Sequence, residues 1–403
     1  MKGSKVAERP AHVPRGLART GPVLFSYGFR PFFLGAALWA IVAMTLWITA
    51  LAGPIELGGS YGAANWHAHE MLFGFAPAVL AGFLLTAVPN WTGRLPVSGR
   101  PLAGLFALWC AGRVALLLPE VLGLPTAAAI DSLFLPALLF ICAREVIAGR
   151  KWKDLKVLGG LLALSLANAC FHVTVIEGEY AQVAMRLGIS AYVVLIIIVG
   201  GRILPSFTRN WLNRSGRTDF PAPYNRFDTI AILIGIGALF AWTLVPNHPI
   251  TAVAALGAAL FHIARLARWR GWATWPEMLL VVLHVAYGFV PLGFAAIAFS
   301  ALGVVEERAV MHILTVGAIA SMMLAVMTRA SRGHTGHPLT ASRTTVTSYA
   351  SIVIAGLLRP FAEMFPEQTA TLYAASGAFW ILAFALFCAE YGPILVRKRR
   401  SIS

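Results

Sequence analysis

Apolar stretches of about twenty residues fill most of this chain, and they constrain its fold more than any other feature. About twenty apolar residues in a helix cross the ~30 Å hydrocarbon core of a bilayer, where the helix pairs its own backbone polar groups. The sequence therefore predicts an all-α integral membrane protein, a bundle of about 12 transmembrane helices. The predicted helices cover residues 29–51, 68–90, 101–118, 125–147, 156–176, 184–205, 227–245, 250–270, 276–301, 306–329, 343–365 and 370–396.

The distribution of charge predicts the topology. Only 12% of the residues are charged, whereas a soluble domain averages about 25%. Lys and Arg gather in the tails and alternate loops, and Glu in the opposite loops, as the positive-inside rule describes. The net charge of +15 therefore indicates affinity for anionic lipid, not for nucleic acid. We expect a multi-pass protein of the bacterial inner (cytoplasmic) membrane with both termini cytoplasmic. Four basic residues break the pattern, namely Arg113, Arg186, Arg308 and Arg359.

The apolar stretches also define the domain organisation. We expect a basic cytoplasmic tail over residues 1–22, a single membrane domain over 23–396 and a second basic tail over 397–403. The loop 206–226 divides the membrane domain into halves 23–205 and 227–396, between which no sequence repeat is evident. The four cysteines form no C-x-x-C motif, so the sequence indicates neither an iron–sulfur centre nor covalently attached c-type haem.

Histidines inside the apolar runs are the main functional signal. A buried imidazole is costly in hydrocarbon, so such residues are candidate functional groups. The predicted topology places one group near the outer face and a pair nearer the inner face, which allows two separate centres. The pattern favours a metal or haem site, and the candidate ligands are His67, His69, His172 and His312 in the outer group and His262 and His284 in the inner pair.

The segment NWHAHEMLFGF (65–75) is the most specific of these. Residues two apart on a helix point about 200° from each other, so His67 and His69 bind one metal only if His67 precedes the helix. Otherwise they face two sites. Glu70 shares a face with His67 and could orient that imidazole as a hydrogen-bond acceptor. The alternative is a polar cap at the membrane interface.

The inner pair has polar neighbours at helical spacing. His284 shares a face with Tyr287 and Glu277, a set that could supply a ligand, a hydrogen-bond donor and a proton entry. The alternative is a histidine bonded to a nearby carbonyl. His262 could instead extend toward the interface beside Arg265.

Three further observations concern the outer group. His172 follows Asn168 by one turn, and a Met-rich stretch (Met322, Met323, Met327) follows His312; methionine suits Cu(I), but packing is the commoner role. Arg113 and Asp131 lie at similar depth on neighbouring helices, so an ion pair is expected. A haem propionate is the alternative partner for Arg113.

Four motifs resemble the NnrS family of bacterial membrane proteins. They are FSYGFRPFF (25–33), NWHAHEMLFGF (65–75), GGRILPSFTRNWL (200–212) and HILTVGAIASMMLAVMTRASRGHTG (312–336). The family is described as twelve-helix proteins that contain haem and copper and act in the nitric oxide response. The resemblance thus implies b-type haem, copper and a role in nitrosative stress or denitrification. A likeness to haem-copper oxidases is weaker, because the chain has no adjacent His-His pair.

Three functions remain open, of which the resemblance implies the first two and the twelve spans with the Arg113–Asp131 pair suggest the third. The first is a nitric oxide reductase that takes electrons from a quinol or a redox-protein donor, with Glu70, Glu277 and Tyr287 as proton carriers. The second is a protein that binds nitric oxide without turnover. The third is a polytopic transporter.

Overall fold

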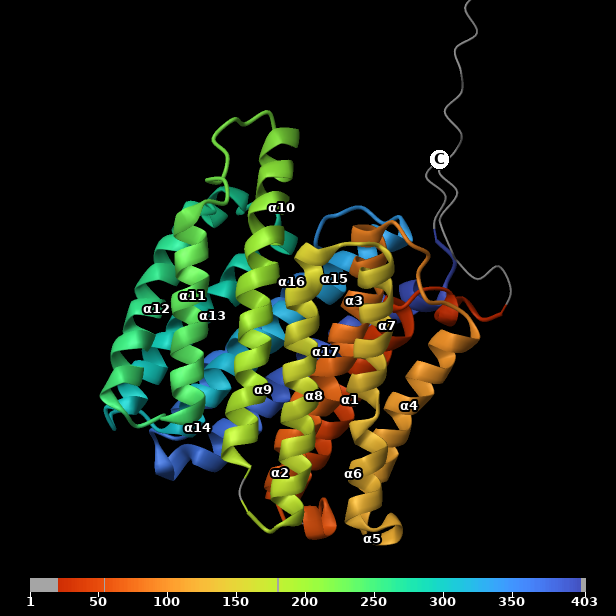
Figure 1. The fold of residues 1–403 in the computed structure, drawn as a ribbon, viewed down its shortest axis with the longest axis vertical. Coiled ribbons are helices and arrows are strands. Elements are labelled where there is room, and N and C mark those ends of the chain that lie inside the picture. Colours follow the sequence, from red (N-terminus) through yellow and green to blue (C-terminus); the bar gives the residue numbers. More distant parts are fainter. Residues whose placement is uncertain (1–20, 54, 180, 400–403) are drawn as a thin grey trace, which may run out of the picture.

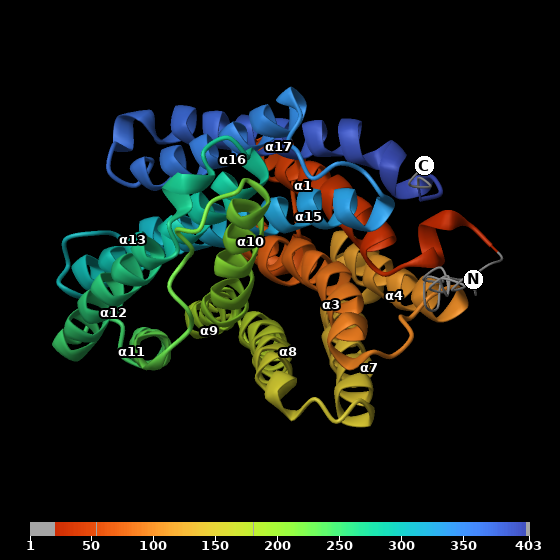
Figure 2. The same cartoon turned by 90° about the horizontal axis from the view of Figure 1, so that it is seen from above.

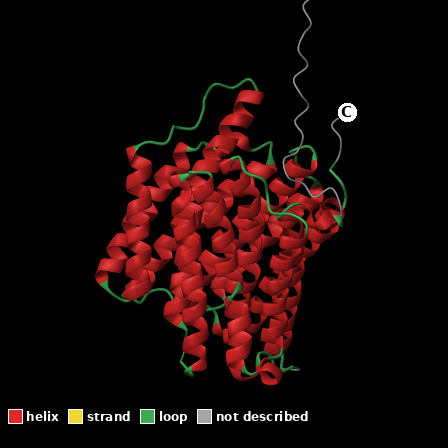
Figure 3. Cartoon of the chain, turned by 45° about the vertical axis from the view of Figure 1, so that its right-hand side comes forward, coloured by secondary structure: helices red, strands yellow, loops and turns green. Residues whose placement is uncertain are grey.

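The structure is a computed structural model that describes residues 21–53, 55–179 and 181–399, and these ranges contain helices and loops but no strand (Figures 1 and 3). Eleven helices within them are long and apolar enough to cross a membrane. The prediction of an all-α polytopic membrane protein is therefore confirmed. The tail residues 1–20 and 400–403 lie outside the described ranges.

The long helical elements agree with the predicted ranges to within a few residues at most ends. In chain order they are α1 (Phe29–Leu51), α2 (Ala63–His69), η3 (Glu70–Phe75), α3 (Ala76–Thr92), α4 (Arg100–Leu117), α5 (Pro119–Leu122), α6 (Leu124–Ser132), α7 (Phe134–Ala148), α8 (Leu155–Ile176), α9 (Gln182–Leu195), η5 (Ile196–Gly200), α10 (Gly201–Arg214), α11 (Arg226–Leu244), α12 (Pro249–Arg268), α13 (Met278–Ala301), α14 (Glu307–His312), η7 (Ile313–Ala320), α15 (Ser321–Thr335), α16 (Arg343–Phe361) and α17 (Thr369–Val396). Short 3₁₀ turns are η1 (Val23–Ser26), η2 (Gly59–Tyr61), η4 (Trp152–Asp154), η6 (Gly271–Thr274) and η8 (Pro366–Gln368).

One predicted span, 343–365, is not among these eleven. It forms the helix α16 but is less apolar than the other predicted spans. Its sequence carries several Thr and Ser, which lower its hydropathy. Their hydroxyls are satisfied within the bundle, since Ser348 donates to the carbonyl of Ala383 at 2.7 Å. α16 packs along α17 and lies beside it at one edge of the bundle (Figure 2).

Two predicted boundaries are wrong. The loop expected at 206–226 begins only after Arg214, because α10 continues as an amphipathic helix beyond the apolar run. α15 likewise continues to Thr335, so His334 lies on a helix rather than in the expected loop. In both places polar residues extend a helix past the hydrocarbon, where hydropathy gives no signal.

Four helical spans form the buried centre of the bundle. The most apolar window is 89% buried in Ala63–Thr92, 72% in Gln182–Arg214, 72% in Met278–Ala301 and 67% in Glu307–Thr335, against 33% to 44% in the other seven. Three of these four spans contain a π-helical segment, namely η3, η5 and η7. A π turn re-aims the residues that follow it and is frequent at functional sites.

The first and last spans close the bundle against each other, because α1 packs on α17. Figure 2 shows α16 and α17 along one side, α8 and α11 on the other, and α15 between them. In Figure 1, α2, α5 and α14 lie at the lower end, here called the α2 end, and α10 rises at the upper end.

Candidate haem cavity and buried histidine network

A large cavity opens near the α2 end, between α1, α2, η3, α9, α14, η7, α16 and α17. Its volume is about 680 Å³, within the roughly 300–1,000 Å³ range of small-molecule and cofactor sites. Two of the predicted histidines line it, His67 from α2 and His312 from the end of α14. We call it the histidine cavity. Its remaining walls are mostly apolar, and four methionines belong to them, namely Met44, Met71, Met185 and Met311.

The ring of His67 is held by stacking. Its centroid lies 4.4 Å from the ring of Trp47, and the two planes are inclined by only 9°. Its Nδ1 atom is buried and has no hydrogen-bond partner among the described residues. An unpaired buried nitrogen is costly, and the ring of His67, which lines the cavity, has no hydrogen bond that would commit it to a purely structural role.

His312 is held through its other nitrogen. Its Nδ1 donates to the carbonyl of Arg308 at 2.7 Å. That bond fixes the tautomer and leaves Nε2 with a lone pair, as in metal-binding histidines anchored by a backbone carbonyl. Because His312 lines the cavity, its imidazole is a candidate metal ligand.

Charged residues line the cavity beside His312. Arg308 and Arg359 contribute guanidinium groups, and Glu306 and Glu307 contribute carboxylates. Arg186 donates to Glu307 at 2.6 Å, and Arg359 lies 2.9 Å from Glu363. The cavity thus combines apolar walls with a margin in which guanidinium groups and carboxylates are equal in number.

A separate buried network surrounds His69 on the other side of α2. Arg113 bridges two carboxylates, Glu70 at 2.5 Å and Asp131, so the predicted Arg113–Asp131 pair is confirmed. The indole nitrogen of Trp39 also donates to Glu70, at 2.7 Å. A buried ion pair in this setting is held by additional hydrogen bonds, and we call these residues, with His69, His172, Asn168 and Tyr61, the His69 network.

Both ring nitrogens of His69 lie against acceptors. Nδ1 is 3.1 Å from Glu70 Oε1, and Nε2 is 2.9 Å from Asn168 Oδ1. Asn168 Nδ2 donates to Asp131 Oδ2 at 2.9 Å, which identifies its oxygen as the atom that faces His69. Only a ring that carries two protons donates to both acceptors. In that form one imidazolium and one guanidinium would balance the two carboxylates.

The same network offers a metal-ligand set. His172 Nε2 lies 3.0 Å from Asp131 Oδ2, and Tyr61 lies 3.1 Å from His172 Nδ1. His69, Asp131 and His172 present ligand atoms that all fall within 4.8 Å of one another, and all three residues are buried. Two imidazoles and a carboxylate suit a transition metal, which would replace protons at these atoms.

The expected partnership between Glu70 and His67 is wrong. Glu70 bonds His69, Arg113 and Trp39 instead. The Glu70 carboxylate is instead paired with the buried guanidinium of Arg113, which comes from α4. His67 and His69 do diverge, as their two-residue spacing predicts, and they face the cavity and the network respectively.

The inner pair lies outside both the cavity and the His69 network. Tyr287 bonds His262 at 2.8 Å and Arg265 at 3.0 Å, so its expected pairing with His284 is wrong. His284 bonds Thr208 instead, at 2.9 Å. Glu277 caps α13 by accepting from the backbone of Leu279.

The sequence held a signal for three residues not predicted as part of a site, namely Arg186, Arg308 and Arg359. Arg308 and Arg359 line the histidine cavity and Arg186 pairs with Glu307 there, while Arg113, a predicted site residue, lies in the His69 network. These are the four basic residues that break the charge asymmetry of the loops. Each of these four cations therefore lies beside the cavity or in the network. By contrast, no feature of the sequence distinguished Trp39, Trp47 and Tyr61 from the many other aromatic residues.

The comparison with known proteins identifies the family of this chain. The family model for NnrS protein matches residues 23–399, which include the cavity, the network and every membrane span. None of the curated proteins searched matches the chain. The chain belongs to the NnrS family, and it is a multi-pass membrane protein linked to the nitric oxide response.

Proposed function

We propose that this protein binds nitric oxide at a b-type haem in the histidine cavity and acts in the removal of nitric oxide. The observation that carries the proposal is the pair of imidazoles on one large cavity, one with an unpaired buried nitrogen and one with a lone pair left by its backbone bond. The guanidinium groups of Arg308 and Arg359 at the margin and the apolar walls support the same ligand.

The residues of the cavity fit a haem. An imidazole nitrogen is a common ligand of b-type haem iron. One of His67 and His312 would hold the iron, and the other would lie beside the position left for nitric oxide. Guanidinium groups bind carboxylates strongly, and Arg308 and Arg359 would hold the propionates. When bound, the haem would supply ferrous iron for nitric oxide and one-electron chemistry. The protein's own part is to orient the imidazoles and to keep water from the apolar walls.

Copper fits the His69 network. His69 and His172 would offer nitrogen ligands and Asp131 an oxygen. Imidazole suits copper, and the same set of two histidines and one carboxylate also suits Fe(II). The two carboxylates of the network exceed its single guanidinium by one charge, so a monovalent cation in place of the second His69 proton would keep the site neutral.

Proton supply would fall to the same residues. Glu70 lies one residue from Met71 and three from His67, both on the cavity, and it accepts from His69. Of the three predicted proton carriers, it is the one whose neighbours in the chain line the cavity. Glu277 and Tyr287 lie elsewhere, so we propose them only as conductors of protons toward it. A quinol or a redox protein would supply electrons.

One observation favours binding without turnover over a reductase. Neither His69 nor Asp131 is among the residues that line the histidine cavity, and both are fully or almost fully buried. A metal in the His69 network would therefore not face a ligand bound in the cavity. A reductase that joins two nitric oxide molecules between two metals needs both to face one space.

An anaerobic reconstitution decides between the two roles. The purified protein receives a reduced quinol or an artificial donor, then nitric oxide, and the loss of nitric oxide and the formation of N2O are followed. Uptake of nitric oxide at haem without N2O supports the binding role, and sustained N2O formation supports the reductase. An unchanged haem spectrum on addition of nitric oxide contradicts both.

A further inference from the structure

A second, smaller cavity lies where α3, α8, the α9–η5–α10 helix and the η7–α15 helix meet. Its volume is about 80 Å³, and we call it the lateral pocket. Apart from Tyr192 and Gly200, every lining side chain is aliphatic, aromatic or Met. The Tyr192 hydroxyl is already committed, since it donates to the carbonyl of Leu72 at 3.0 Å.

This lining selects a small uncharged occupant. A buried water needs two to four polar partners, and an apolar cavity stays dry but takes xenon or benzene when it is large enough, about 150 Å³ in one engineered case. The lateral pocket offers no free polar partner, and its volume admits a few atoms. An ion or a polar substrate would lose its hydration there without compensation.

The outer side of the lateral pocket belongs to the lipid-facing surface. Phe83, Ile196, Val199, Ile203 and Val326 are half-buried, and all lie within the apolar spans. Nonpolar gases such as nitric oxide concentrate in hydrocarbon relative to water. The pocket therefore opens toward the phase in which such a gas is most abundant.

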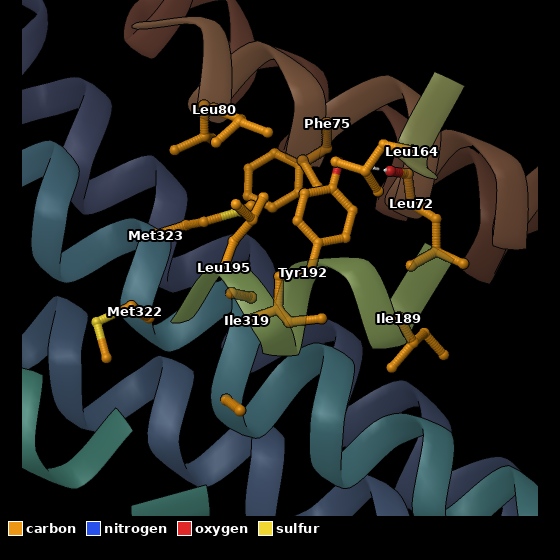
Figure 4. Close-up of a cluster of buried hydrophobic side chains, with 14 of the residues drawn as sticks. Leu72, Phe75, Leu80, Leu164, Ile189, Tyr192, Leu195, Ile319, Met322 and Met323 are labelled. Carbon is orange, nitrogen blue, oxygen red and sulfur yellow. Dashed lines mark hydrogen bonds between the residues drawn. The ribbon is translucent and has the colours of Figure 1, made fainter. Parts of the chain in front are cut away.

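The inner side of the lateral pocket is shared with the histidine cavity. Ile319 lines both. Figure 4 shows Ile319 among Tyr192, Leu195 and Met322, which line the pocket, with Phe75 and Ile189 of the histidine cavity nearby. The partition between the two spaces is thus formed by side chains, with Ile319 common to both.

All three π-helical segments contribute to these two spaces. η3 supplies Leu72 and Phe75 to the histidine cavity, η5 supplies Val199 to the lateral pocket, and η7 carries Ile319. The irregular turns place side chains where a regular helix would not, at the point where the two cavities approach each other.

We propose that the lateral pocket is the entry port through which a small uncharged gas passes from the lipid to the histidine cavity, with the Ile319 side chain as the gate. The identity of the gas as nitric oxide rests on the proposed function. Passage requires only rotamer changes of Ile319 and its neighbours, which are fast on the scale of ligand association.

The test begins with xenon, which needs no haem. Crystals of the full-length protein pressurised with xenon should show xenon bounded by Tyr192, Leu195 and Ile319. Met323→Trp, which fills the pocket without touching the histidine cavity, should abolish that site. A pocket filled by a lipid chain that xenon does not displace, or an absence of xenon in the wild type, overturns the proposal.

The second arm measures nitric oxide association and dissociation at haem by flash photolysis. A gate alters both rates by the same factor, so Met323→Trp should slow each roughly ten-fold while the Kd stays unchanged. Met323→Ala should accelerate both, and Leu292→Trp, on the exposed face of α13, should change neither. Rates unaffected by Met323→Trp, or a change confined to dissociation, contradict the gate. A wild type that takes up no nitric oxide contradicts the proposed function, and the xenon result then decides whether the pocket accepts gas.

Discussion

Trp47 and His67 form a stacked pair, with ring centroids 4.4 Å apart and planes inclined by 9°. The two residues come from α1 and α2, so the contact ties the first span to the helix that carries the candidate ligand. The indole holds the plane of the imidazole while the edge of the ring stays available to the cavity. This pair defines the orientation that the proposed haem ligand needs.

Replacing Trp47 should weaken haem binding. An aromatic pair contributes about 0.5–1.5 kcal/mol beyond its buried area, so Trp47→Leu should lower haem affinity several-fold by releasing the His67 ring. Haem titration of the apoprotein measures the effect. Trp275→Leu is the control, because Trp275 is 68% exposed. Equal affinities for the two variants would contradict a positioning role for Trp47.

Removing Arg113 should destabilise the fold far more than removing a peripheral arginine. Arg113→Met leaves Glu70 and Asp131 buried without their cation, a loss of about 3–5 kcal/mol. Arg94→Met breaks a pair in which the arginine side chain is 44% exposed, and such pairs contribute only about 0–1 kcal/mol. Thermal unfolding in detergent compares them. Similar unfolding temperatures would show that the network does not hold the bundle.

The copper content and the haem content of the protein should each fall in different variants. His172→Ala and Asp131→Asn should lower copper per protein and leave haem in place, because neither residue lines the histidine cavity. Of His67→Ala and His312→Ala, the variant that removes the iron ligand should do the reverse. Elemental analysis and haem absorbance on the same preparations measure both. Loss of both cofactors in all three variants, with a native unfolding temperature, would refute two separate sites.

The contacts of Glu363 should give stability that acid removes. Partial burial raises the pKa of this carboxyl, but Arg359 at 2.9 Å and Tyr373 at 2.8 Å outweigh it, so the pKa lies below its usual value. A carboxyl whose pKa is lower in the folded state than in the unfolded state stabilises the fold at a pH above its unfolded pKa of about 4.3. That stabilisation is lost as the pH falls through the folded pKa. The contribution is at most about 1 kcal/mol, since water screens the pair.

The measurement is the unfolding temperature between roughly pH 6 and pH 3.5. Wild type should lose more stability over this range than Glu363→Gln, whereas the exposed Glu367→Gln should follow wild type. Parallel curves for wild type and Glu363→Gln would contradict the assignment.

The sequence predicted the elements of this fold better than their side-chain partners. Apolar runs predicted the spans, because hydrocarbon thickness sets their length. α16 is less apolar than the other spans, and its polar side chains form hydrogen bonds within the bundle. The pairing of Arg113 with Asp131 was predictable because an isolated buried charge is too costly.

The partners of Glu70 and Tyr287 were not predictable from spacing. Glu70 pairs with Arg113 from α4, and Tyr287 meets His262 from a different helix. Both depend on packing between spans that are distant in sequence. The grouping of the outer histidines into the cavity pair and the network pair was open for the same reason, although the two-residue spacing of His67 and His69 did predict their divergence.

The most direct test of the haem assignment is the pyridine haemochrome spectrum of the purified wild type and four histidine variants. The account predicts b-type bands in the wild type, a strong loss of haem in His67→Ala or His312→Ala, and full retention in His262→Ala and His284→Ala, which lie outside the cavity. A wild type without b-type bands, or full haem content in both His67→Ala and His312→Ala, would contradict it.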